Sequence, residues 1–99
     1  MSLEKDFQSS LIKKIVDILP GAVVLKNDPN YLQGVPDLIV LYNDRWAALE
    51  CKRSSTCKHQ PNQDYYVDIL GRMSYAAFIC PENEREILDE IQLALGARG

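Results

Sequence analysis

The sequence has 99 residues, of which 46 % are hydrophobic and 25 % are charged. This composition is typical of one globular domain, here residues 1–99, and excludes a disordered chain. No apolar run approaches the ~18 residues that a membrane span needs, and the start of the chain lacks the pattern of a secretory signal. We therefore expect a cytoplasmic protein with no membrane partner.

The net charge of −3 disfavours nucleic-acid binding when it is considered alone, because contacts to phosphate require Lys and Arg. The charge is unevenly distributed, however. Residues 81–99 carry five acidic and two basic side chains, whereas residues 1–80 carry nine of each. The whole acidic excess therefore lies in the last segment. If some of the remaining acids bind a divalent metal, the rest of the molecule becomes net positive.

The first 36 residues predict a helix, a strand and a loop. Apolar residues recur at three- and four-residue steps over residues 3–19, which predicts an amphipathic helix. Ser2 is a plausible N-cap, and Pro20 with Gly21 ends the helix. The β-branched run at residues 22–26 predicts a strand. Residues 27–36 contain two prolines and a glycine and predict a loop. The apolar side chains of the helix are Leu3, Phe7, Leu11, Ile12, Ile15, Val16, Ile18 and Leu19.

The remaining segments predict a hairpin, a helix, a strand and a final helix. Residues 37–42 and 45–52 read as two strands joined at Asn43 and Asp44, which tolerate the left-handed backbone of a tight turn. Residues 61–73 read as a helix that begins with a proline, residues 82–95 read as a helix that follows one, and residues 75–80 read as a strand. The expected order is α-β-β-β-α-β-α, a mixed α/β fold.

The hairpin fixes a register with a chemical consequence. It places Asp37 directly opposite Glu50, and it places Lys52 on the same face as Glu50. The other face carries only apolar side chains. Its residues are Leu38, Val40, Ala47, Leu49 and Cys51.

Two directly opposed carboxylates repel each other, and a divalent cation between them removes this repulsion. Mg²⁺ binds carboxylate and water oxygens and leaves positions for a substrate phosphate. With a lysine beside it, such a site is suited to phosphodiester hydrolysis. A simpler interpretation is that Lys52 pairs with Glu50 as a surface salt bridge. The register alone leaves both interpretations open.

The same residues resemble a known signature. Gly34-Val35-Pro36-Asp37, followed after twelve residues by Glu50-Cys51-Lys52, resembles the signature of PD-(D/E)XK nucleases. Pro61-x-Gln63 and Tyr66 make the chain similar to the virus-type replication-repair nuclease (VRR-NUC) branch. The resemblance covers residues 3–80. It implies the restriction-endonuclease-like α-β-β-β-α-β core, here with an extra C-terminal helix.

The resemblance also assigns roles to residues. It implies that Asp37, Glu50 and the backbone carbonyl of Cys51 bind Mg²⁺ or Mn²⁺. Lys52 would be the catalytic lysine, and Gln63 the glutamine that enters the site from a helix. A further metal ligand would come from the first helix, where Glu4 matches best and Gln8 is the alternative. The alternative interpretation of Glu4 is a solvated acid favoured by the helix dipole.

By the same resemblance, the protein is a hydrolase that acts as an endodeoxyribonuclease on branched DNA, like a Holliday-junction resolvase. A homodimer and a phage source in a bacterial host are also implied, and no nucleotide cofactor is expected. The dimer interface could be the apolar stripe of the last helix, or Trp46 and Leu41 if they are exposed. Two alternatives remain: a duplex or flap endonuclease without junction preference, and a non-catalytic DNA-binding or recombination accessory protein.

Basic and aromatic residues near the signature are candidates for DNA contact. Together with Lys52, a group of side chains predicts a local basic region: Arg53, Lys58, His59 and Arg72. Such side chains could bind backbone phosphates or be ordinary surface charge. Tyr66 could stack on a base or pack against the sheet. His59 could be a general base or an exposed loop residue.

The three cysteines indicate no metal or redox motif. Their number is odd, and no two have the spacing of a zinc or disulfide-exchange motif. Cys57-x-His59 fits no standard zinc pattern. We expect Cys51 and Cys80 to be small buried hydrophobic residues.

Overall fold

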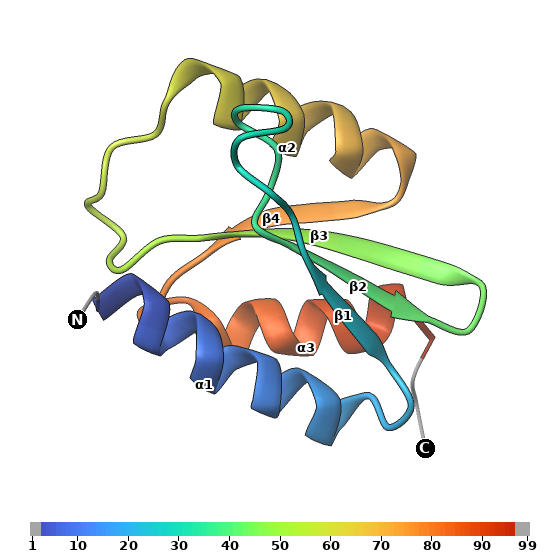
Figure 1. The fold of residues 1–99 in the computed structure, drawn as a ribbon. Helices are drawn as coiled ribbons and strands as arrows, with labels where there is room; N and C mark the ends of the chain where they lie inside the picture. The colour runs from blue at the N-terminus through green and yellow to red at the C-terminus, as the bar shows by residue number, and fades with distance from the viewer. Residues whose placement is uncertain (1–2, 97–99) are drawn as a thin grey trace.

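The computed structural model describes residues 3–96, with side chains from residue 5 onward, so the predicted cap Ser2 lies outside the described residues. The element order is the predicted α-β-β-β-α-β-α (Figure 1). The boundaries differ from the predicted ones by at most two residues. The elements are α1 (Leu3–Ile18), β1 (Val23–Lys26), β2 (Leu38–Tyr42), β3 (Arg45–Cys51), α2 (Pro61–Met73), β4 (Tyr75–Ile79) and α3 (Glu84–Ala94).

The strands form one sheet in the order β1-β2-β3-β4. The first three strands are antiparallel, and β4 runs parallel to β3 because α2 provides the crossover between them. The predicted hairpin register is confirmed, from Leu38 opposite Leu49 to Tyr42 opposite Arg45. Asn43 has a φ of 57°, the left-handed conformation expected of the turn.

The helices cover the two faces of the sheet unequally. Helices α1 and α3 lie together on one face, and α2 lies alone on the other (Figure 1). The core fills the space between the sheet and the helix pair, and the predicted apolar face of the hairpin forms its centre. Burial of these side chains is the main favourable contribution to folding. The core includes Leu11, Ile15, Leu19, Leu38, Val40, Ala47, Leu49, Cys51, Ile87, Ile91 and Leu95.

Three expectations about apolar residues are wrong. The stripe of α3 is not a free interface, because Ile87, Ile91 and Leu95 are buried in the core. Trp46 is half-buried rather than exposed, although Leu41 is exposed. Val16, expected on the buried face of α1, is 42 % exposed. For the two helices the sequence period was correct, but the packing of α1 and α3 against the sheet determines which side of each stripe is covered.

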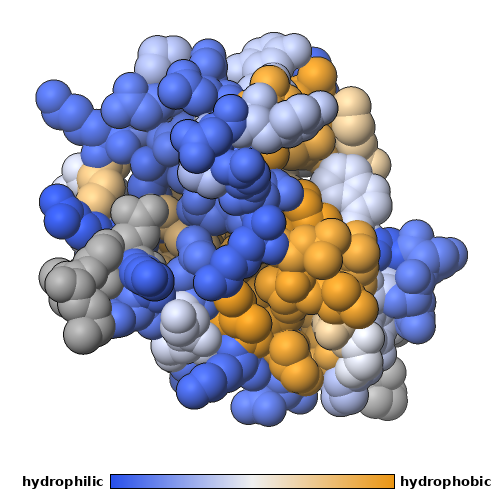
Figure 2. Space-filling model, in the orientation of Figure 1, coloured by the Kyte–Doolittle hydropathy of each residue, from blue (hydrophilic) through white to orange (hydrophobic). Residues whose placement is uncertain are grey.

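The α2 face of the sheet is only partly covered. Helix α2 packs on β3 and β4 and contains no fully buried residue. Beyond it, Val23 and Leu25 of β1 are 53 % and 47 % exposed, next to exposed Leu41 of β2. Figure 2 shows apolar side chains gathered over these strands. We call Val23, Leu25 and Leu41 the apolar patch.

Within residues 3–96, none of the helices combines the length and the apolar character that a membrane crossing requires.

Candidate active site

Asp37 lies just before β2, at the end of the hairpin where the register places Glu50 across from it. Its Oδ2 accepts a hydrogen bond of 2.9 Å from the backbone N–H of Cys51. Burial raises the pKa of Asp37 above its ordinary value. The Cys51 N–H, the charge of Lys52 and the side chain of Glu50 act in the opposite direction without cancelling the effect of burial. Asp37 is thus a desolvated carboxyl group in contact with the other candidate residues.

Glu50 and Lys52 are connected through the amide of Gln63. Glu50 is 3 % exposed, and its Oε2 accepts a hydrogen bond of 3.0 Å from Nε2 of Gln63. On the other side of the same amide, Oε1 of Gln63 accepts a hydrogen bond of 2.7 Å from Nζ of Lys52. The structure therefore brings together Asp37, Glu50, Lys52 and Gln63, the four residues for which the sequence predicted a catalytic role.

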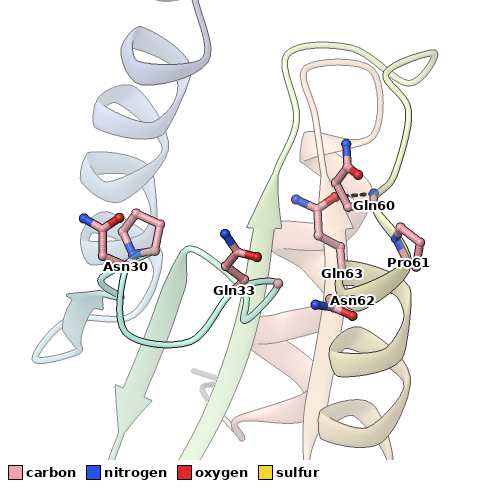
Figure 3. Close-up of a pocket in the computed structure, with 8 residues that line it drawn as sticks. Asn30, Gln33, Gln60, Pro61, Asn62 and Gln63 are labelled. Carbon is pink, nitrogen blue, oxygen red and sulfur yellow. Dashed lines mark hydrogen bonds between the residues drawn. The ribbon is translucent and has the colours of Figure 1, made fainter.

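Gln63 is held in place by the start of α2. Its Oε1 also accepts a hydrogen bond of 2.9 Å from the backbone N–H of Gln60, as Figure 3 shows. The backbone N–H of Gln63 donates to the carbonyl of Gln60 at 2.9 Å. This reciprocal arrangement resembles a capping box, which satisfies donors that the first turn of a helix leaves unpaired. A capping interaction thus also orients the amide toward Glu50 and Lys52.

The segment before Asp37 is fixed from the neighbouring strand. The side chain of Asn27 donates to the carbonyl of Pro36 at 2.6 Å, and the backbone N–H of Asn27 donates to the carbonyl of Asp37 at 2.8 Å. Pro36 itself is fully buried. These contacts hold Asp37 at a defined position although it lies just outside β2.

The donor set fits a hard divalent cation. Carboxylate oxygens of Asp37 and Glu50, with a backbone carbonyl such as that of Cys51, are the ligands that Mg²⁺ and Mn²⁺ prefer. Within the described residues, no group of three or more His, Cys, Asp or Glu side chains could hold a metal ion. Mg²⁺ is often held by one or two carboxylates and keeps several waters, so two carboxylates are compatible with it.

The raised pKa of Asp37 supports this fit, because a cation would offset the cost of a charged carboxylate in this partly buried position. The remaining predicted ligand, Glu4, belongs to α1, but its side chain lies outside the described residues. Its alternative, Gln8, is half-buried on the next turn of α1.

The predicted basic region is only partly assembled. Arg53 and Lys58 are exposed on the loop that follows Lys52, and the carbonyl of Lys58 accepts a hydrogen bond of 3.3 Å from Nζ of Lys52. Arg72 is not brought to this group. It lies nine residues beyond Gln63, roughly 14 Å along the helix axis, and pairs with Asp68 at 2.6 Å.

The two remaining candidates for DNA contact have protein partners. The ring of His59 stacks on Phe78 with centroids 3.7 Å apart, and its Nδ1 lies 2.9 Å from Oδ1 of Asp64. Tyr66 is half-buried and packs edge-to-face against the more exposed Tyr65 at 5.1 Å. His59 is thus an exposed loop residue, one of the two expectations for it, and its ring stacks on Phe78 of β4.

Sequence reasoning missed the role of two residues near the site. Asn27 anchors the segment before Asp37, and Asn62 meets Gly34 where the loop approaches α2. The signal available for the second contact was Gly34, because glycine permits both a positive φ and a close backbone approach. No pattern in the sequence indicated which residue Gly34 would meet.

The comparisons with known proteins agree with this architecture. The sequence matches no protein-family model, and it has no significant similarity to any curated protein. A solved structure described as a VRR_NUC domain protein superposes with a TM-score of 0.68 at 15 % sequence identity. The match covers 98 % of this chain and 91 % of the other. The fold of this chain is therefore that of a VRR_NUC domain, as the signature from Gly34 to Lys52 predicted.

Proposed function

We propose that this protein is a divalent-metal-dependent endodeoxyribonuclease that hydrolyses phosphodiester bonds in branched DNA. The observation that carries the proposal is the connection of Asp37, Glu50, Lys52 and Gln63 at one end of a VRR_NUC-like sheet. A non-catalytic protein of the same fold would gain nothing from a buried Glu50 beside a desolvated Asp37, because buried charge is costly unless it is compensated.

Each side chain has a role that follows from its contacts. Asp37 and Glu50 would hold Mg²⁺ or Mn²⁺, and the bound cation would supply water activation and charge stabilisation at the phosphate. Lys52 donates two of its three N–H bonds to protein oxygens, which leaves the third for the attacking water or a phosphate oxygen. Gln63 keeps both Glu50 and Lys52 in place while this happens.

The charge distribution is compatible with a DNA substrate. Helix α3, which carries most of the acidic excess, lies on the opposite face of the sheet from α2 (Figure 1). Exposed Arg53 follows Lys52 directly, exposed Lys58 lies on the same loop, and both would bind the DNA backbone beside the cut. Preference for a four-way junction over a flap is the finer part of the proposal and rests on the resemblance to resolvases.

The test compares labelled four-way junction, flap and linear duplex with Mg²⁺ or with EDTA. The wild type should cut the junction fastest and only with Mg²⁺, whereas Glu50→Gln should not cut. The control is Asp44→Asn, which removes an exposed acid from the turn of the same hairpin and should cut normally. Equal cutting of all three substrates would remove the junction preference. Cutting by Glu50→Gln, or in EDTA, would remove the proposed site.

The expected homodimer would use the apolar patch. Two cuts placed symmetrically across a junction require two active sites, which a twofold dimer supplies. Strand β1 is an edge strand of the sheet, and exposed apolar residues on an edge strand favour association. A second copy of this chain is therefore the occupant that we propose for Val23, Leu25 and Leu41.

A further inference from the structure

A cleft of about 630 Å³ lies between the loop of residues 27–36 and the first turn of α2 (Figure 3). Pro29 and Pro61 lie at its two sides, and none of its described lining residues is charged. Instead, the lining is dominated by amide side chains. These are Asn30, Gln33, Gln60, Asn62 and Gln63.

Gly34 allows the two walls of the cleft to meet. Its φ is +92°, and a Cβ at this position would lie 2.3 Å from Cβ of Asn62, far inside contact distance. The loop and the helix are therefore packed backbone against side chain at this point. The shape of the cleft therefore depends on the glycine at position 34.

The cleft is continuous with the candidate active site through Gln63. The side chain that lines the cleft is the same one that donates to Glu50 and accepts from Lys52. A molecule in the cleft would therefore lie next to a phosphate bound at Asp37 and Glu50. In a DNA substrate, that position belongs to the nucleotide that flanks the cut.

The chemistry of the lining indicates which part of that nucleotide the cleft would bind. Amides present both donors and acceptors, which match the edges of nucleobases. The side chains of Asn30, Gln33 and Asn62 make no hydrogen bond within residues 3–96, so their amides are available. A phosphate offers only acceptors, so it would use the N–H donors of these amides and leave their oxygens without a partner, whereas the edge of a base uses both. Proline rings offer apolar faces against which a flat base can pack.

We propose that this amide cleft binds an unpaired nucleobase next to the scissile phosphate. The inference rests on the proposed nuclease function for its location and deepens it by naming a substrate feature. Taking a base out of a duplex is costly, and least so when the base is mismatched or already single-stranded. DNA with an unpaired nucleotide at the cut, such as one at the centre of an open junction, is therefore the preferred substrate.

The test measures binding without metal, so it does not depend on cleavage. A DNA tetranucleotide containing all four bases is titrated into ¹⁵N-labelled protein, next to an abasic tetranucleotide with the same phosphates. The side-chain amide resonances of Gln33 and Asn62 should shift with the first ligand and not with the second. The base-containing ligand should bind about tenfold more tightly or better, as expected from amide hydrogen bonds to the edge of a base.

Two variants and a control complete the test. Gln33→Ala and Asn62→Ala should lose the preference for bases, and the second keeps the Cβ that meets Gly34. Ser10→Ala, at an exposed position of α1, should retain the preference for bases. Equal affinity for the abasic and the base-containing tetranucleotide would overturn the inference, and so would unchanged amide resonances of Gln33 and Asn62. Base-dependent binding by a protein that does not cut with Mg²⁺ would support the cleft and refute the nuclease proposal.

Discussion

Glu50 and Gln63 come from different elements, a buried strand and the first turn of a helix, and meet at 3.0 Å between Oε2 and Nε2. The Glu50 side chain is almost fully buried, and the Gln63 amide is held by Lys52 and by the backbone of Gln60. Sheet and helix are thus connected by a polar contact at the point where we place the chemistry. A contact of this kind orients a metal ligand as well as stabilising it.

Gln63→Ala should lower the rate of Mg²⁺-dependent cleavage by about 10- to 100-fold, the range found when partners of metal ligands are removed. It should also lower the free energy of unfolding by about 1–2 kcal/mol, because buried Glu50 loses a donor. Single-turnover cleavage and urea denaturation measure the two effects. Asp68→Ala, at an exposed position of the same helix, should leave cleavage unchanged and cost at most about 0.5 kcal/mol for its lost pair with Arg72. An unchanged cleavage rate for Gln63→Ala would contradict the role of the amide.

Asp37→Asn should raise the melting temperature at pH 7 and abolish cleavage. Burial raises the pKa of Asp37, so the folded state holds this proton more tightly than the unfolded state does. Stability contributed by the protonated group is therefore lost as pH rises from about 4 through the folded-state pKa. Asn keeps an acceptor for the Cys51 N–H without the charge. The increase in melting temperature of Asp37→Asn over the wild type should be small at pH 3 and largest at neutral pH.

Mg²⁺ provides the matching test of the same carboxyl group. At pH 7 the cation should raise the melting temperature of the wild type, since it binds the folded state and compensates the charge. It should have little effect on Asp37→Asn. Asp44→Asn controls for the loss of one surface charge. An equal response of all three proteins to Mg²⁺ would place the binding site elsewhere.

Gly34→Ala should destabilise the protein more than Gly21→Ala does. Both glycines have a positive φ, +92° and +93°, so both substitutions introduce backbone strain of about 1–2 kcal/mol. A Cβ at position 21 meets nothing within 4 Å, whereas one at position 34 collides with Asn62. The collision should add about 1–3 kcal/mol. Urea denaturation of the two variants isolates this difference, and equal losses would mean that the loop moves freely away from α2.

One thiol of the three should react rapidly in the folded protein. Cys51 and Cys80 are buried, whereas Cys57 is partly exposed on the loop after Lys52. A hydrogen bond with the Ser54 hydroxyl lowers the pKa of the Cys57 thiol, which favours the reactive thiolate. Titration with a chromogenic disulfide should give one fast equivalent in buffer and three in denaturant. Ser54→Ala should slow the fast reaction; two fast equivalents in buffer would contradict the burial of Cys51 and Cys80.

Leu25→Glu should convert the protein from a dimer to a monomer. A carboxylate in the middle of the apolar patch would have to be desolvated at the interface. Sedimentation velocity at micromolar concentration measures the change. Leu93→Glu, at an exposed apolar position on α3, should leave the dimer unchanged. A wild type that sediments as a monomer would exclude the proposed interface.

The hairpin was predictable because local chemistry determines it. Asn43 favours the turn, the turn sets the register, and the register places Asp37 beside Glu50. Gln63 was predictable through the resemblance, since its spacing from Lys52 alone does not indicate a contact. The order of elements followed from periodicity and from the prolines that precede two of the helices.

The errors concern relations between distant segments. The α3 stripe has the same period whether it covers the core or binds a partner, and only the packing against α1 and the sheet decides this. Arg72 was assigned to the basic region because of its charge, but it lies at the end of α2 far from the site. The amide cleft depends on how a loop without periodicity approaches Asn62, which no local pattern specifies.

Helix α2 adds no fully buried side chain to the molecule, unlike the two helices on the opposite face. Detaching it from β3 and β4 should require less free energy than global unfolding. The element that delivers Gln63 is thus a helix without a fully buried side chain of its own. Part of the energy of DNA binding would then be spent on immobilising it, and a nuclease without substrate would spend more of its time with its metal ligands incompletely oriented.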